Sequence, residues 1–313
     1  MSDLPGKVHI LEAGPREGFQ FEPPGIATAD KIRLIEALAE ARVPEIECAS
    51  FVNPKVVPQM ADGFDIAQGI RRIDGVTYGC MWLNEKGFLQ ALDSGLATPA
   101  LTAGSASDTF LLKNNNRTQE QQLEGQRKLR RLYTENGLGA GPLYLFTAFG
   151  CNYEGEMPVA RAMARLTELV TLCEEEGTPP SCLMLCDTIG AADPVSVRAL
   201  VDAARTRWPD YPVALHLHDT RGLGIANAMA GLELGVARFD ASVGGLGGCP
   251  FAGHKSAAGN ISTEELVLLC DRLGIETGID LGALIEAARL AEEIVGHPVA
   301  GKLAHAGLFN RRR

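Results

Sequence analysis

Short β-rich runs alternate with longer amphipathic runs along almost the whole chain, and this alternation constrains the fold more than any other feature. Eight runs have strand composition: 8–14, 45–51, 76–83, 99–106, 142–150, 181–187, 212–219 and 238–245. Helical patterns lie between them, including 28–43, which opens on Thr28 as a predicted cap, 158–177, and 193–208, which opens on Asp193 followed by Pro. Eight strand-then-helix units predict an α/β fold, a closed parallel (β/α)8 TIM barrel.

The chain has 313 residues, enough for one large α/β domain or two smaller ones. No stretch has the composition of a linker, so we expect a single TIM-barrel domain over 1–313. The barrel would cover about 7–275, and a C-terminal helical segment would cover about 276–313, with 280–297 as an additional helix packed outside or over the barrel. A doubly wound open sheet is the alternative, and it is disfavoured because no Gly-rich dinucleotide fingerprint follows the first strand.

Charge and cysteine usage limit the expected partners and cellular compartment of the protein. The formal net charge of −10 argues against broad nucleic-acid binding, and we expect the basic run at 127–131 to be a solvated helix face. No apolar run approaches the roughly 20 residues that span a bilayer, and the N-terminal stretch has no signal or transit pattern. The eight cysteines form no CxxC pair. We therefore expect a reduced, cytoplasmic protein with neither nucleic acid nor membrane among its partners.

Polar residues gather at the predicted strand ends, where barrel enzymes build their active sites. The most informative pair is His216 and His218, because side chains two residues apart on a strand project from the same face. Two imidazoles on one face can share a divalent cation, and oxygen donors from other strand ends would complete a site for Mg²⁺ or Mn²⁺. Core histidines bonded to backbone are the alternative interpretation.

Several blocks of the sequence resemble a known family. They are VHILEAGPREGFQFE, IECASFVNPKVVPQM, CDTIGAADP, LHLHDTRGLGIANAMAGLELGV and DASVGGLGGCPFA. This pattern resembles that of the 3-hydroxy-3-methylglutaryl-CoA lyases, which belong to the metal-dependent TIM-barrel lyases and Claisen synthases. The resemblance runs from about Lys7 to about Gly278, and the SFVxPKxVPQM stretch and the GGLGGCP loop are specific to the lyase branch.

The resemblance implies a role for each matching position. The implied ligands of a divalent cation, Mg²⁺ or Mn²⁺, are Glu17, His216, His218 and Asn260. The implied catalytic residues are Arg16, Glu47, Asp187 and Cys249. The implied substrate-binding residues are Gln20, Ser50 and Ser107. Members of the family often form dimers, so a homodimer is the implied assembly.

The implied reaction needs these kinds of groups. Cleaving the bond between a tertiary alcohol carbon and the α-carbon of a thioester requires the hydroxyl to lose its proton while an enolate forms. A divalent ion lowers the pKa of the hydroxyl, and the guanidinium of Arg16 would stabilise the enolate. The thiol of Cys249 would protonate the carbon if its glycine-rich loop closes over the site. The substrate would be an acyl-CoA, and the products acetyl-CoA and a β-keto acid, which is acetoacetate for the methylglutaryl substrate.

Two features depart from the family pattern and leave the acyl group open. Glu17 stands where the family normally has Asp, and the stretch from Cys249 to Asn260 is about two residues longer than is typical. The alternatives are a lyase for a different 3-hydroxy-3-substituted acyl-CoA, or a Claisen-type synthase or 2-keto-acid aldolase on the same barrel. A binding protein that has lost catalysis is a third alternative, and the joint presence of the implied ligands, Arg16 and Cys249 argues against it.

Overall fold

The computed structural model describes residues 4–248 and 259–309. The described residues fall into two compact units. One unit holds residues 4–5 and 98–239, and the other holds residues 6–97, 240–248 and 259–309. Both are built from parallel strands followed by helices, as the alternation in the sequence predicts.

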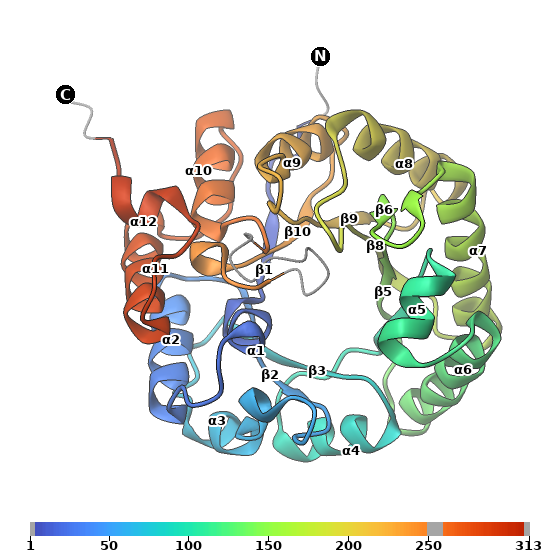
Figure 1. The fold of residues 1–313 in the computed structure, drawn as a ribbon, viewed down its shortest axis with the longest axis horizontal. Helices are drawn as coiled ribbons and strands as arrows, with labels where there is room; N and C mark the ends of the chain where they lie inside the picture. Colours follow the sequence, from blue (N-terminus) through green and yellow to red (C-terminus); the bar gives the residue numbers. More distant parts are fainter. Residues whose placement is uncertain (1–3, 249–258, 310–313) are drawn as a thin grey trace. The chain divides into compact units, whose positions relative to one another are not determined.

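The unit at 98–239 contains four parallel strands in the order β4 (Thr102–Ser105), β5 (Gly141–Phe146), β8 (Pro180–Cys186) and β9 (Val213–His216). Its helices are α5 (Asp108–Asn115), α6 (Gln119–Glu135), α7 (Val159–Glu175), α8 (Pro194–Arg207) and α9 (Gly224–Glu233). Helices α6 to α9 follow one another along one side of these strands (Figure 1). A short antiparallel hairpin, β6 (Gly150–Cys151) and β7 (Gly155–Glu156), follows β5.

The other unit contains the parallel strands β1 (His9–Glu12), β2 (Glu45–Phe51) and β3 (Thr77–Trp82). Strand β10 (Arg238–Ala241) begins in the first unit and ends in this one, where the amide of Ala13 donates to the carbonyl of Ala241 over 2.8 Å. The longer helices are α2 (Thr28–Glu40), α3 (Gly63–Gly69), α4 (Glu85–Ser94), α10 (Thr263–Leu273) and α11 (Leu281–Val295). The shorter segments are η1 (Gly14–Gly18), α1 (Phe19–Phe21), η2 (Pro58–Met60), η3 (Val243–Gly245) and α12 (Lys302–Ala306).

The elements match the sequence predictions closely, and the differences have local causes. Each of the eight predicted runs contains a strand, and Asp193 caps α8 by accepting hydrogen bonds from the amides of Val195 and Ser196. The predicted cap at Thr28 is wrong, because Ala27 is the N-cap and the Thr28 hydroxyl donates to Asp62 over 2.8 Å. The predicted additional helix is α11, which packs against α2 and α10.

The interior of the first unit includes a sulfur-rich cluster. Cys182, Met184 and Cys186 lie at alternate positions of β8, so they share one face, and they pack with Ala214, Tyr144 and Phe146. The seven cysteines within the described ranges are buried thiols, which fits the expectation that they pack as small hydrophobic side chains. Within those ranges, every helix is too short or too polar to traverse a lipid bilayer.

The basic run at 127–131 is only partly a solvated face, and this corrects the sequence prediction. Lys128 and Arg131 are exposed, whereas Arg130 is completely buried. Its guanidinium donates to the hydroxyl and carbonyl of Thr178, to the carbonyl of Ala100 and to the hydroxyl of Thr102. These acceptors are all neutral, and burial lowers the pKa of Arg130. The arginine therefore ties α6 to the starts of two strands through hydrogen bonds.

Replacing Arg130 with Met tests this role, because Met keeps an unbranched apolar side chain and removes the donors. Since several buried acceptors lose their partners, we expect the free energy of unfolding to fall by about 2–4 kcal/mol in urea denaturation. The matched control is Lys128→Met on the exposed face of the same helix, for which we expect a change within about 0.5 kcal/mol. Equal effects of the two substitutions would contradict the role assigned to Arg130.

Candidate active site

The predicted site residues fall into two groups, one in each unit, and most of them lie at or shortly after the carboxyl ends of strands, whereas Glu47 is the third residue of β2 and Asn260 precedes α10. The first unit contains Ser107, Asp187, His216 and His218. The second unit contains Arg16, Glu17, Gln20, Glu47, Ser50 and Asn260. Cys249 lies outside the described residues.

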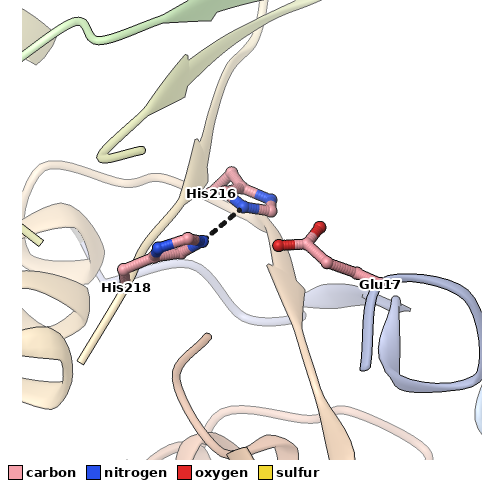
Figure 2. A group of neighbouring side chains, drawn as sticks. All are labelled: Glu17, His216 and His218. Atoms are coloured by element: carbon pink, nitrogen blue, oxygen red, sulfur yellow. Dashed lines mark hydrogen bonds between the residues drawn. The ribbon is translucent and has the colours of Figure 1, made fainter. Parts of the chain in front are cut away.

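The two histidines face each other at the end of β9. His216 is the last residue of the strand, and its Nε2 atom lies 3.2 Å from that of His218 (Figure 2). Both side chains are buried. At this separation two lone pairs would repel, so one ring must donate its N–H to the other, or both must point their lone pairs at a cation. The expectation that the two rings project into one space is confirmed.

Asp187 follows β8 directly and has one anchored oxygen. Its Oδ1 atom accepts hydrogen bonds from the amides of Ala191 and Ala192 over 2.7 and 3.1 Å. Its Oδ2 atom is buried and has no hydrogen-bond partner among the described residues. Burial raises the pKa of the Asp187 carboxyl, while His218 and the two amides oppose the rise. A buried carboxyl with one uncommitted oxygen can accept or release a proton at that atom.

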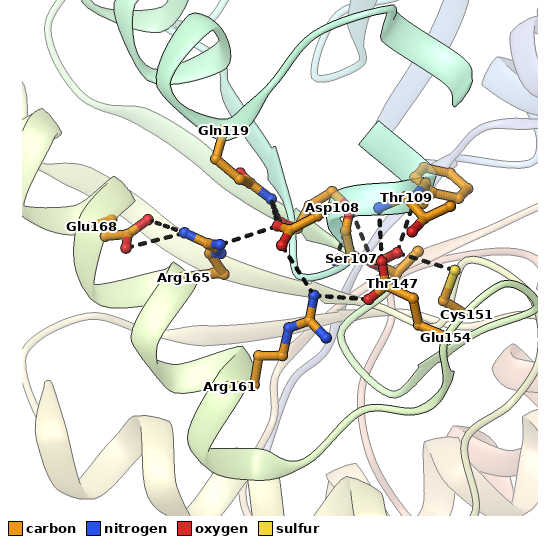
Figure 3. A network of polar contacts seen from close by, with 12 residues as sticks. Ser107, Asp108, Thr109, Gln119, Thr147, Cys151, Glu154, Arg161, Arg165 and Glu168 are labelled. Carbon is orange, nitrogen blue, oxygen red and sulfur yellow. Dashed lines mark hydrogen bonds and ion pairs between the residues drawn. The ribbon is translucent and has the colours of Figure 1, made fainter. Parts of the chain in front are cut away.

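Ser107 belongs to a polar network at the end of β4 (Figure 3). Its hydroxyl oxygen caps α5 by accepting a hydrogen bond from the amide of Phe110 over 3.0 Å, and the hydroxyl donates to the sulfur of Cys151 over 3.1 Å. The network continues through Asp108, which pairs with Arg165 at 3.0 Å. These bonds orient the first turn of α5.

Arg16 and Glu17 lie together in the turn η1 that follows β1. Both side chains are largely buried within this five-residue π-type turn, a conformation that is frequent at functional sites. The Nε atom of Arg16 donates to an oxygen of Glu47 over 2.5 Å, and its terminal Nη2 atom lies 3.2 Å from Glu17 Oε2. Burial raises the pKa of the Glu47 carboxyl, and Arg16 opposes this rise. One guanidinium is thus held between two carboxylates.

Asn260 is a buried amide whose two polar atoms differ in their partners. Its Nδ2 atom donates to Glu17 Oε1 over 3.1 Å and to the carbonyl of Leu246 over 3.3 Å. Its Oδ1 atom has no hydrogen-bond partner among residues 4–248 and 259–309, although the side chain is 1% exposed. An uncommitted amide oxygen is a suitable ligand for a hard divalent cation, so this donor fits the implied metal.

Two other predicted residues lie on or after neighbouring elements. Ser50 is 1% exposed at the end of β2, and its hydroxyl has no partner within the described part of the chain. Gln20 is half-buried on α1, directly after the turn that carries Arg16 and Glu17.

Glu12 anchors the candidate site, and sequence reasoning did not identify it. It is the last residue of β1 and is completely buried, and its Oε1 atom accepts hydrogen bonds from the amides of Gly14 and Val243 over 2.7 and 2.8 Å. The hydroxyl of Thr263 donates to Oε2 over 2.5 Å. One carboxyl group therefore anchors the turn with Arg16 and Glu17 and the start of the glycine-rich loop. The available signal was an acid inside the apolar run VHILEAG.

A second buried carboxyl lies near Glu12. Glu264 accepts a hydrogen bond from the amide of Gly244 over 3.1 Å, and its negative charge disfavours ionisation of Glu12. Burial, which is the largest effect in each case, raises the pKa of both carboxyls to about 7. In the unfolded chain both groups would ionise at their ordinary values. The folded state thus binds more protons, and stability is lost as the pH rises from about 4.5 to about 7.

Glu12→Gln tests this coupling because the amide keeps an acceptor for both backbone N–H groups and can donate to Thr263. We expect the variant to lose less stability than the unaltered chain between pH 5 and pH 8, by up to about 3 kcal/mol in urea denaturation. The control is the exposed Glu124→Gln, which should leave the pH profile unchanged. An identical profile for Glu12→Gln would show that this carboxyl ionises normally in the folded protein.

Sequence comparisons with known proteins match this chain to one enzyme family. The sequence model of the HMGL-like family matches residues 7–291. Hydroxymethylglutaryl-CoA lyase YngG of Bacillus subtilis is 40% identical over 298 residues, which cover 95% of this chain and 96% of that protein.

Comparisons with solved structures match the chain to the same enzymes. The crystal structure of the Bacillus subtilis HMG-CoA lyase matches with a TM-score of 0.89 at 39% identity, over 97% of this chain and 98% of that one. An HMG-CoA lyase from Acinetobacter baumannii, in complex with coenzyme A and 3-methylmalate, matches with a TM-score of 0.87 at 36% identity, over 98% and 97% of the two chains. The predicted (β/α)8-barrel fold class is confirmed by these likenesses.

Proposed function

Since the chain belongs to the HMGL-like family, we propose that it is a divalent-metal-dependent carbon–carbon lyase. It cleaves 3-hydroxy-3-methylglutaryl-CoA to acetyl-CoA and acetoacetate. The observation that carries this proposal is the likeness to hydroxymethylglutaryl-CoA lyase YngG at 40% identity over 95% of the chain. The complex of the Acinetobacter lyase with coenzyme A supports an acyl-CoA as the substrate class.

The proposed cation ligands are Glu17, His216, His218 and Asn260, and Figure 2 draws the first three. Glu17 and the two histidines are buried, and each offers a ligand atom of a type that binds divalent cations. The uncommitted oxygen of Asn260 would be the fourth donor. Oxygen and imidazole donors suit Mg²⁺ or Mn²⁺. When bound, the cation polarises the substrate hydroxyl and lowers its pKa.

The remaining roles belong to groups of the chain itself. Arg16 would stabilise the enolate oxygen, since its guanidinium is already held in place by Glu47. Asp187 would accept the hydroxyl proton at its uncommitted Oδ2 atom. Cys249 would deliver a proton to the carbon of the departing acetyl group. The three residues proposed to contact substrate are Gln20, Ser50 and Ser107.

The setting of the reaction is also a proposal. The two units would form one barrel domain over 1–313, which the match of the Bacillus structure to 97% of the chain supports. The presence of seven cysteines as thiols in the described ranges supports a reducing, cytoplasmic compartment. A homodimer remains the assembly that the family resemblance implies.

The proposed function predicts that turnover requires a divalent metal and a methylglutaryl thioester. The purified protein should release acetyl-CoA and acetoacetate from the methylglutaryl thioester, lose turnover after exhaustive chelation, and regain it with Mg²⁺ or Mn²⁺. Full turnover of metal-free protein would refute the metal role.

A panel of 3-hydroxy-3-substituted acyl-CoA esters, assayed in parallel by acetyl-CoA release, tests which acyl group the enzyme prefers. A much higher kcat/KM for another ester would reassign the substrate but keep the reaction class.

Cys249→Ala should lower kcat by at least about 100-fold, because a general acid contributes roughly 100- to 10,000-fold. Binding of the acyl-CoA, measured by calorimetry, should change by less than about threefold, since the thiol acts only in the chemical step. Cys270→Ala, at a buried thiol of α10, is the control for loss of a cysteine elsewhere. Parallel losses in kcat and in binding would remove the proton-transfer role of Cys249.

A further inference from the structure

We propose that Glu17 and Leu246 are positioning residues for Asn260. The carboxylate of Glu17 and the backbone carbonyl of Leu246 hold the amide so that its oxygen is presented to the cation and its nitrogen is turned away. The inference rests on the proposed function, because it concerns one ligand of the proposed metal site. It assigns to Glu17 a task beyond that of a ligand.

The hydrogen bonds of Asn260 determine which terminal atom of its side-chain amide is the nitrogen and which is the oxygen. The Nδ2 atom has two hydrogen-bond partners, a carboxylate oxygen of Glu17 at 3.1 Å and the carbonyl oxygen of Leu246 at 3.3 Å, and both act as acceptors. The group facing them must therefore be the NH₂ of Asn260. A rotated amide would place three oxygens together and leave two N–H donors unpaired inside the protein. The remaining Oδ1 atom is buried and has no partner within the described ranges.

The surrounding backbone approaches the amide so closely that only glycine fits. A Cβ atom on Gly247 would lie 2.8 Å from Asn260 Nδ2, and one on Gly259 would lie 2.4 Å from the carbonyl carbon of Gly247. Gly247 also has a φ of +111°, which favours glycine. A Cβ atom on Gly18 would lie 2.8 Å from Leu246 Cβ, so the residue after Glu17 packs directly on the residue whose carbonyl binds the amide.

Each oxygen of Glu17 has its own partner. Oε1 accepts from Asn260, and Oε2 lies 3.2 Å from a guanidinium nitrogen of Arg16. Asn260 is thus linked through one carboxylate to the guanidinium that would meet the enolate. The amide oxygen is oriented before the cation arrives, so binding does not require rotation of the side chain.

The test uses an exchange of amide and carboxylate. Asn260→Asp is isosteric and adds negative charge, which by itself would favour a divalent cation. It also places an oxygen against Glu17 Oε1 and the Leu246 carbonyl. We expect Mn²⁺ affinity, measured by isothermal titration calorimetry, to fall at least about 10-fold, with a smaller metal-induced rise in melting temperature.

A double variant that exchanges the carboxylate and the amide should restore Mn²⁺ binding. Combining Glu17→Gln with Asn260→Asp restores one carboxylate and one amide, so the hydrogen bond between positions 17 and 260 can re-form in the opposite sense. We expect the double variant to bind Mn²⁺ more tightly than Asn260→Asp alone. If each residue acts only as an independent ligand, Asn260→Asp will bind Mn²⁺ at least as tightly as the unaltered protein, and adding Glu17→Gln to it will only weaken binding.

Three results separate the possible failures. If the unaltered protein does not bind Mn²⁺, the proposed function fails. If it binds Mn²⁺ and Asn260→Asp binds equally or more tightly, or the double variant shows no rescue, only the positioning role fails. Circular dichroism and metal-free melting check that each variant is folded. If Asn260→Asp folds only in combination with Glu17→Gln, this result also supports the hydrogen bond.

Discussion

The structure of the second unit depends on the hydrogen bonds that satisfy one buried acid. Glu12 is completely buried at the end of β1, where a carboxyl group without partners would strongly destabilise the fold. It accepts hydrogen bonds from the amides of Gly14 and Val243, which begin the two segments that lead to Arg16, Glu17 and the glycine-rich loop. The requirement to satisfy this carboxyl therefore also places the polar side chains that follow.

Many buried polar atoms of the candidate site form hydrogen bonds or ion pairs with other residues of the protein, but a few do not. The guanidinium of Arg16 is engaged by Glu47 and Glu17, and the nitrogen of Asn260 by Glu17 and Leu246. Within the described residues, the atoms left without a partner include Asn260 Oδ1, Asp187 Oδ2 and Ser50 Oγ. Such atoms are where a cation, a proton or a substrate can bind. The carboxylate of Glu17 contacts both Arg16 and Asn260 and so links two residues of the candidate site.

Local patterns in the sequence predicted most of the fold and the pairing of the two histidines, whereas the resemblance to the lyase family implied the other site residues. The alternation of strand and helix composition located all eight parallel strands, and β2 has the predicted bounds. Asp193 followed by Pro identified the start of α8. The HxH spacing predicted two imidazoles in one space, and their Nε2 atoms lie 3.2 Å apart, although β9 ends at His216 and His218 lies two residues beyond it. Each of these features depends on residues only a few positions apart.

Tertiary structure alone decided the features that depend on distant residues. Glu12 is satisfied by partners 231 and 251 positions away, and Arg130 is buried because Thr178 and Ala100 meet its guanidinium. The β6–β7 hairpin was not predicted because its two-residue strands are too short to show a period. Periodicity and capping are local properties that can be read along the chain. Which buried polar group meets which partner depends on how remote segments pack, and neither spacing nor composition records it.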